Sequence, residues 1–153
     1  MANKEENTLL KIVLLFGGLY FFKHFFEKST EPQKIARISG IYIRDLIPYE
    51  DSVGKKVFYK ELCKLTDNEA SEVISKMIIP ARKVENLEYP LYKGFKGTTI
   101  TGELRFSYFR ILLYEISENE YLMLNIFKKK RNDTPLVEIR KAEKRIAEYL
   151  AAL

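Results

Sequence analysis

Cysteine and histidine are scarce in this chain, which has one of each in 153 residues. With Cys63 alone, the chain cannot form an internal disulfide or a cysteine-based zinc site. A thiol buried in a helix is the favoured interpretation over a reactive one. His24 lies in a hydrophobic segment near the N-terminus, apart from the main body of the sequence. A Ser-His-Asp triad and a His-rich metal site are therefore poor candidates.

Long apolar runs are also missing. The segment 9–26 is hydrophobic, but its uninterrupted part, 12–22, is shorter than the roughly 20 residues that span a bilayer. Lys11 and Lys23 stand at its two ends, where their ammonium groups can reach the membrane surface. Two interpretations stay open: a marginal spanning helix that anchors the protein, or a hydrophobic helix that packs on protein. The expected location is the cytoplasm, with membrane contact through residues 9–26 as the variant.

A polar stretch, EKSTEPQK, follows this segment, and Pro32 within it breaks regular structure. We therefore expect an N-terminal helix and linker over residues 1–33 and one folded domain over residues 34–153. The chain is 46% hydrophobic and 13% aromatic, which is enough for a core. Its formal net charge of +5 gives weak support to a polyanionic partner.

The first half of the domain reads as one strand and two helices. RISGIYIRDLIPYED predicts a strand closed by Pro48, and DSVGKKVFYKELCKL has apolar residues at helical spacing. A second helix opens at Thr66 or Asp67, with Glu69 completing a capping pattern after Thr66. Pro80 is expected to end or kink this helix.

The second half reads as strands followed by a helix. The strand candidates are TITGELRF, FRILLYEI and YLMLNIF, the last two joined by SENE as an antiparallel hairpin. A terminal helix is predicted with Pro135 at its first position and Thr134 as its cap. This order predicts an α+β fold: a small, mainly antiparallel sheet with two helices packed on one face, and a C-terminal helix.

Three phrases carry a resemblance to a known family. YEDSVGKKVFYKEL resembles an opening strand and the polar turn into a first helix, and GELRFSYFRILLYE resembles E-L-R on one strand followed by R-I on the next. MLNIFKKKRNDTPLVEIRKA resembles an apolar strand that ends in Phe, two lysines, a polar loop and Thr-Pro before a final helix. In this order they resemble the RelE/ParE superfamily of type II toxin–antitoxin toxins, nearest to its HigB-like, phage-derived branch, over residues 41–150.

The resemblance implies a RelE-like fold and an endoribonuclease that cuts messenger RNA on the ribosome without a metal or cofactor. It also implies a cognate antitoxin, expected to be of the helix-turn-helix type. In such chemistry the ribose 2′-OH attacks the adjacent phosphate and the 5′-oxygen leaves, so the protein must orient the hydroxyl, move protons and stabilise the extra phosphorane charge.

The expected catalytic residues are Arg105, Arg110, Lys128 and Lys129. Arg105 is the first choice for stabilising charge in the transition state, because a guanidinium matches phosphate oxygens. Arg110 either shares that role or forms a cross-strand pair with a carboxylate, for which Glu103 and Glu115 are the candidates. Lys128 and Lys129 match the two family lysines and can supply a base or an acid. The alternative is a solvated strand end whose charges protect a sheet edge.

Further cations are expected to bind RNA outside the reacting centre. Lys130 and Arg131 extend the lysine pair and would hold the flanking backbone. Lys93 and Lys96 would bind phosphates at the mouth of the site, or else belong to a basic loop without function.

Aromatic residues near these cations are candidates for stacking. Tyr92 or Phe95 would stack on a base. Tyr108 is interpreted as a turn or core residue rather than a stacking one.

Two other functions stay open from the sequence. A ParE-like inhibitor of DNA gyrase would share the fold and need no nuclease residues. A membrane-tethered, non-catalytic interaction protein would follow if residues 9–26 insert into lipid.

Overall fold

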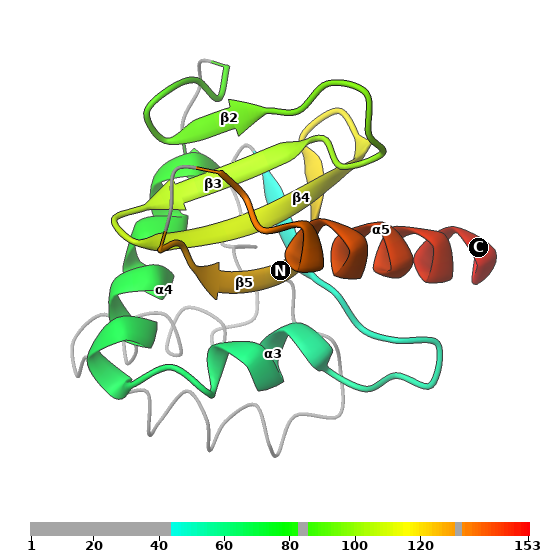
Figure 1. Ribbon diagram of the computed structural model, residues 1–153, viewed down its shortest axis with the longest axis horizontal. Coiled ribbons are helices and arrows are strands. Elements are labelled where there is room, and N and C mark those ends of the chain that lie inside the picture. Colours follow the sequence, from blue (N-terminus) through cyan, green and yellow to red (C-terminus); the bar gives the residue numbers. More distant parts are fainter. Residues whose placement is uncertain (1–43, 83–85, 131–132) are drawn as a thin grey trace, which may run out of the picture.

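The computed structural model describes residues 44–82, 86–130 and 133–153 (Figure 1). Its strands are β1 Asp45–Pro48, β2 Tyr92–Gly94, β3 Gly102–Phe106, β4 Phe109–Ser117 and β5 Glu120–Lys128. Its helices are α3 Val57–Leu62, α4 Asp67–Arg82 and α5 Leu136–Ala151. The predicted order of strand, two helices, strands and terminal helix is confirmed, and β2 is an additional short strand. The expected N-terminal hydrophobic helix and the boundary at residues 33–34 lie outside the described residues.

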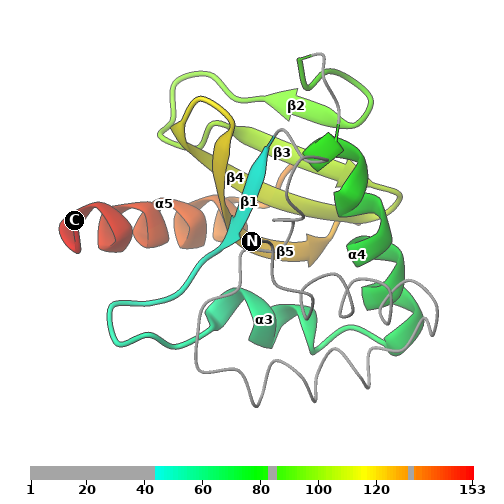
Figure 2. The same ribbon diagram turned by 180° about the vertical axis from the view of Figure 1, so that it is seen from behind.

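The strands of the described residues form a five-stranded sheet in the order β1-β5-β4-β3-β2. β1 pairs with β5 in parallel, and the other neighbours are antiparallel. Seen from behind, β1 appears in cyan (Figure 2). The predicted hairpin of β4 and β5 is confirmed, with Asn119 in its turn at φ 69°. The fold class is therefore α+β with a mostly antiparallel sheet.

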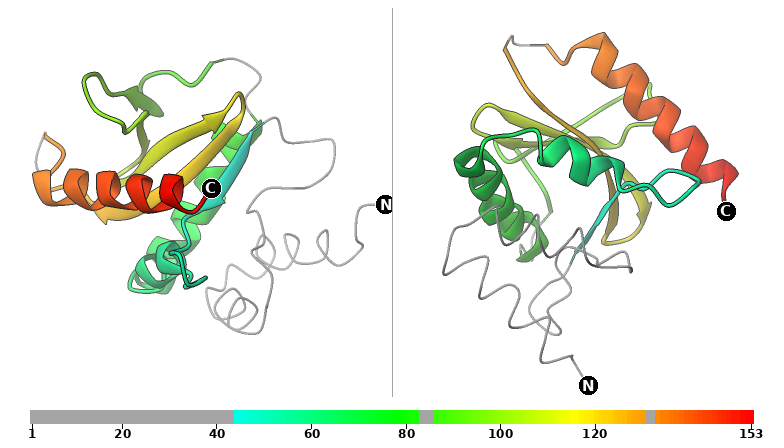
Figure 3. Two further views of the ribbon diagram at one scale, coloured as in Figure 1. Left: turned by 90° about the vertical axis from the view of Figure 1, so that its right-hand side faces the viewer. Right: turned by 90° about the horizontal axis from the view of Figure 1, so that it is seen from below.

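The sheet is covered on both faces, with α3 and α4 on one side and α5 on the other (Figure 3). Phe109, Ile111 and Leu113 of β4 belong to the buried cluster under α3 and α4. Leu112, between them in sequence, belongs to the cluster under α5. A strand buried on both faces reads as a continuous apolar run, which explains why this segment shows little alternation.

The start of α4 agrees with the sequence prediction, whereas the end of α3 and the start of α5 differ from it. The capping box of α4 is confirmed: the Thr66 amide donates to Glu69 Oε2 at 3.0 Å, and the Glu69 amide donates to Thr66 Oγ1 at 3.3 Å. Pro80 lies inside α4, which runs on to Arg82. Helix α3 is shorter than predicted and ends at Leu62, so Cys63 is its half-buried C-cap rather than a residue within it.

The predicted start of α5 is wrong. Pro135 occupies the N-cap position, and no side chain caps the helix. The Thr134 hydroxyl donates instead to Glu103 Oε2 at 2.9 Å. Because its hydroxyl is bonded to the buried Glu103 carboxylate, Thr134 does not cap the first turn of α5.

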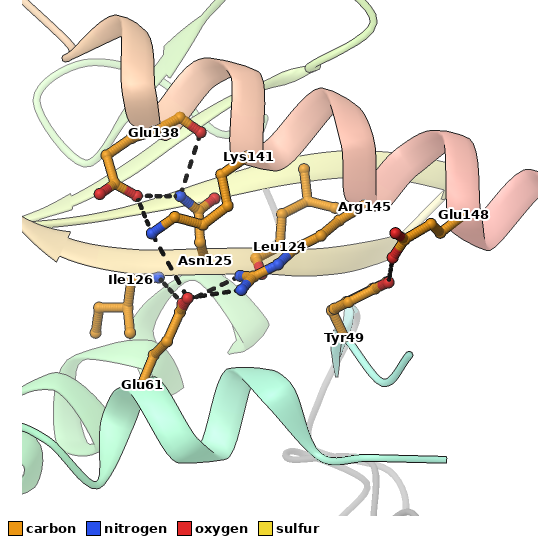
Figure 4. Close-up of polar contacts among 9 residues, drawn as sticks. All are labelled: Tyr49, Glu61, Leu124, Asn125, Ile126, Glu138, Lys141, Arg145 and Glu148. Carbon is orange, nitrogen blue, oxygen red and sulfur yellow. Dashed lines mark hydrogen bonds and ion pairs between the residues drawn. The ribbon is translucent and has the colours of Figure 1, made fainter. Parts of the chain in front are cut away.

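A partly buried ion pair fixes α5 against α3 and the edge of β5 (Figure 4). The pairing of β1 with β5 stops at Met123, so the edge groups of β5 beyond it need other partners. The Ile126 amide donates to Glu61 Oε2 at 3.2 Å, and Arg145 donates to the Leu124 carbonyl at 2.6 Å. Arg145 also holds both carboxylate oxygens of Glu61, at 2.7 and 3.1 Å. This pair takes the place of a strand along that edge.

Neighbouring contacts extend the same network along α5 (Figure 4). The Asn125 amide donates to Glu138 Oε2 at 2.6 Å, and Lys141 pairs with Glu138 at 2.7 Å. Near the other end of the helix, the Tyr49 hydroxyl donates to Glu148 at 2.5 Å. Burial, reinforced by the hydrogen bond to Glu148, raises the pKa of Tyr49. These bonds hold α5 against β5 and against Tyr49, which follows β1.

Candidate functional site: a cationic cluster around a buried carboxylate

Two arginines stand directly opposite each other near the turn of the β3–β4 hairpin. The strand register pairs Arg105 with Arg110, and residues opposite each other on antiparallel strands project to the same face. Like charges in this position destabilise a sheet unless something compensates them. The compensating group is Glu103, two residues before Arg105 on β3 and therefore on the same face.

Glu103 forms ion pairs with three cationic side chains. Its Oε1 lies 3.6 Å from Arg105 Nε, 3.7 Å from Arg110 Nε and 3.7 Å from Lys129 Nζ. The carboxylate is fully buried, and the Lys129 side chain is only 6% exposed. Its second oxygen accepts the bond from Thr134 described above. We call Glu103, Arg105, Arg110 and Lys129 the Glu103 cluster.

The contacts within the Glu103 cluster are ion pairs without hydrogen bonds. Glu103 Oε1, Arg105 Nε and Arg110 Nε are buried, and none has a hydrogen-bond partner within the described part of the chain. Buried polar atoms are normally satisfied, so three such atoms facing one another mark a site that is not optimised for stability. Three cations around one carboxylate leave two positive charges in excess.

Arg110 is the most constrained of the three cations. Its Nη1 donates to the carbonyls of Ser107 at 2.9 Å and Phe109 at 2.7 Å. Burial lowers the pKa of the Arg110 guanidinium, the charge of Arg105 lowers it further, and Glu103 opposes both effects. The side chain is thus fixed on the hairpin turn, and its charge is kept in a partly desolvated place.

A pocket of about 420 Å³ opens beside the two guanidiniums. Its lining includes Arg105, Arg110 and Lys76, together with Tyr89 and Phe106. The ring of Tyr89 lies under the guanidinium of Arg105, whose Cζ is 5.3 Å from the ring centroid. The pocket therefore combines cationic groups with apolar and aromatic walls.

The structure brings three of the four expected catalytic residues together and separates the fourth. Lys128 points to the opposite face of the sheet, where it pairs with Glu69 of α4 and lies 5.8 Å from the centroid of the Phe109 ring. The hydrogen bond from Lys128 lowers the pKa of Glu69. Because side chains alternate along an extended chain, neighbours such as Lys128 and Lys129 cannot serve the same face.

Three of the four expected RNA-binding cations lie among the described residues, and all three are exposed. Lys93 of β2 stands directly opposite Glu103 in the register, so it shares the face of the cluster, and it is exposed. Lys96 is exposed in the loop after β2, and Lys130 is exposed after β5. Arg131 lies outside the described residues.

The aromatic residues differ from the expectation. The Tyr92 hydroxyl donates to the Thr101 carbonyl at 3.1 Å, and Phe95 packs against the cluster of apolar side chains under α5. Both rings are thus engaged in the fold. Tyr89 and Tyr108 are instead 78% and 72% exposed. Tyr108 lies in the β3–β4 hairpin turn, which agrees with its interpretation as a turn or core residue.

Sequence reasoning missed two members of this site. Glu103 appeared only as a possible partner of Arg110, and that ion pair is confirmed. The position of Glu103 between three cations depends on the pairing register of β3 with β4, which cannot be predicted from the sequence alone. Tyr89 precedes Pro90 in a loop, and its only sequence signal was a large aromatic residue in a polar setting.

No protein-family model matches this chain, and no curated protein matches it. Within residues 44–82, 86–130 and 133–153, no three His, Cys, Asp or Glu side chains are grouped so that they could hold a metal ion. No helix in that part of the chain has the length and apolar character needed to cross a membrane. Residues 9–26, the segment expected to contact a membrane, lie outside it.

Proposed function

We propose that this chain is the toxin of a type II toxin–antitoxin system and that it cuts messenger RNA on the ribosome without a metal ion. The observation that carries the proposal is the Glu103 cluster, which sets two excess positive charges beside an open pocket. A phosphodiester carries one negative charge, and the phosphorane formed from it carries two. The cluster is thus better matched to the transition state than to the substrate, which is what catalysis requires.

In the proposed reaction the 2′-oxygen bonds to phosphorus while the bond from phosphorus to the 5′-oxygen breaks. The 2′-hydroxyl gives its proton to a water molecule, and the 5′-oxygen receives one proton as it leaves. The products are a 2′,3′-cyclic phosphate and a 5′-hydroxyl end. Arg105 and Arg110 hold the non-bridging oxygens, because both guanidiniums line the pocket. Lys129 lies in the same cluster and supplies positive charge, and a proton, to the leaving oxygen.

Exposed lysines near the cluster in the strand register and in the sequence support a polyanionic substrate. Lys93 shares the face of Glu103, and Lys130 follows Lys129 directly. Contacts of this kind supply affinity for the nucleic-acid backbone and make it sensitive to salt. The proposed antitoxin, of the helix-turn-helix type, would cover this basic surface with an acidic or apolar segment.

The test is cleavage of messenger RNA in a translation extract by the purified full-length protein, with and without EDTA. We expect arrest of translation and fragments that end in a cyclic phosphate, equally in both conditions. Arg105→Ala should reduce the cleavage rate by about 10²-fold, because it removes a charge that faces the transition state. Arg140→Ala, which removes an exposed arginine on α5, is the matched control and should leave the rate unchanged.

Intact messenger together with inhibited gyrase supercoiling would overturn the proposal and assign the chain to the gyrase-inhibiting branch. A wild-type rate in Arg105→Ala would remove this cluster from the chemistry.

A further inference from the structure

Tyr89 is an exposed aromatic ring at the cationic pocket. Its side chain is among the lining residues of the pocket and is 78% exposed. One face of the ring meets the guanidinium of Arg105. A ring that is covered by a cation on one face and is still this exposed has its other face open to solvent.

The pocket has two chemically different parts. Arg105 and Arg110 offer guanidiniums, which suit a phosphate. Tyr89 and Leu91 offer aromatic and aliphatic surface, which suits a flat, weakly polar group. A nucleotide unit has these two parts covalently joined: an anionic phosphate and a planar base.

We propose that Tyr89 forms a nucleobase subsite, on which the base next to the scissile phosphate stacks while Arg105 holds that phosphate. The proposal rests on the proposed function, since it takes single-stranded RNA as the substrate. Stacking on an aromatic side chain accepts every base, because each has a π-face. The subsite therefore positions the substrate without selecting its sequence.

The contact between Arg105 and Tyr89 gives the subsite its geometry. A guanidinium over an aromatic ring keeps both groups in place through a cation–π interaction. The phosphate site and the stacking surface are therefore adjacent, within the span of one nucleotide. Tyr89 acts as a positioning residue and takes no part in proton transfer.

Tyr108 provides a matched control within the same chain. It is also a tyrosine, 72% exposed, but it lies in the hairpin turn and not among the residues that line the pocket. General stickiness of exposed aromatic rings would affect both residues equally, whereas a subsite would depend on Tyr89 alone.

The experiment measures binding of a short single-stranded oligoribonucleotide to the full-length protein. Its riboses carry 2′-O-methyl groups, which block cleavage, and it contains 2-aminopurine, whose fluorescence falls on stacking. A second oligonucleotide has the same backbone with abasic positions. We expect wild type and Tyr89→Phe to bind the first probe equally and to quench it. Tyr89→Ala should bind it about tenfold more weakly and lose the quenching, while Tyr108→Ala should behave as wild type.

The abasic probe separates the subsite from the phosphate site. Wild type should bind it about as weakly as Tyr89→Ala binds the first probe, and Tyr89→Ala should lose nothing further. Arg105→Ala should weaken both probes by the same factor. Equal quenching by Tyr89→Ala and wild type would overturn the subsite while leaving the proposed function intact. Equal losses for Tyr89→Ala on both probes would also overturn it, since the ring would then only support Arg105. No binding of either probe by wild type would overturn both proposals.

Discussion

Replacement of Glu103 by glutamine is the sharpest test of the cationic cluster. Glutamine keeps the shape of the side chain and can still accept the hydrogen bond from the Thr134 hydroxyl. It removes the negative charge that lies 3.6–3.7 Å from Arg105, Arg110 and Lys129. Three largely buried cations would then face one another without a counter-charge.

The size of the effect follows from these distances. At an effective dielectric constant of 20, each ion pair contributes about 4 kcal/mol of attraction, before repulsion among the cations and desolvation are subtracted. Removal of one partner from a buried ion pair costs about 3–5 kcal/mol in measured cases. Arg110 keeps its two bonds to backbone carbonyls, and Arg105 is partly exposed, which favours the lower end. We expect Glu103→Gln to lower the free energy of unfolding by about 3 kcal/mol.

Urea denaturation of the full-length chain measures this change, with Glu72→Gln as the control. Glu72 pairs with Lys76 on the surface of α4, and both side chains are substantially exposed. The control should cost at most about 0.5 kcal/mol, as exposed helical ion pairs do. If Glu103→Gln costs no more than Glu72→Gln, the carboxylate does not hold the cluster together.

Inorganic phosphate extends the same test to the site. An anion bound between the guanidiniums would replace the charge that Glu103→Gln removes. Phosphate should therefore raise the stability of Glu103→Gln more than that of wild type, by up to about 2.7 kcal/mol at a hundredfold excess over its dissociation constant. Equal shifts in the two proteins would refute the view that the excess charge of the cluster is available to a phosphate.

Three further predictions concern the surroundings of the cluster. Lys129→Ala should reduce messenger cleavage strongly in the extract assay, whereas Lys128→Ala should leave the rate near wild type, because only Lys129 reaches the cluster. Glu61→Gln should lower the free energy of unfolding by about 2–3 kcal/mol in urea denaturation, because Arg145 loses a charged partner at 2.7 Å; a change within 0.5 kcal/mol would contradict the role of the pair at the β5 edge. The pKa of Glu69 is lowered in the folded state, so its contribution to stability is present above the ordinary value of 4.5 and is lost as the pH falls through the lower folded value. Stability measured against pH should thus fall less in acid for Glu69→Gln than for wild type; parallel curves would contradict this.

The sequence predicted those parts of the fold whose signals are local. The Thr66–Glu69 capping box involves residues only three apart in the sequence. The hairpin of β4 and β5 is predicted by two apolar runs joined by a short polar turn. Strand β2 escaped prediction because YKG is too short and too flexible to show a pattern. It becomes a strand only because β3 is there to pair with it.

The site was predicted less completely because it depends on register and facing. Arg105 and Arg110 could be chosen from the sequence, but their direct opposition is a property of the pairing of β3 with β4. Lys128 and Lys129 look equivalent in the sequence, but their side chains lie on opposite faces of the sheet. Thr134 satisfies the local rule for a helix cap, yet a buried carboxylate distant in the sequence takes its hydroxyl.

The Glu103 cluster is difficult to explain by stability alone. A buried carboxylate and its cations can often be replaced by apolar side chains without loss, and sometimes with a gain. Here the cost is greater than usual, since three buried polar atoms of the cluster have no hydrogen-bond partner within the described residues. Two arginines opposite each other on neighbouring strands add repulsion to that cost. A need for positive charge at the pocket explains all three features, because the side chains of Arg105 and Arg110 line the pocket while one carboxylate lies near their Nε atoms. The Glu103 carboxylate then allows three cations to lie close together, and their two uncompensated positive charges attract the anionic substrate.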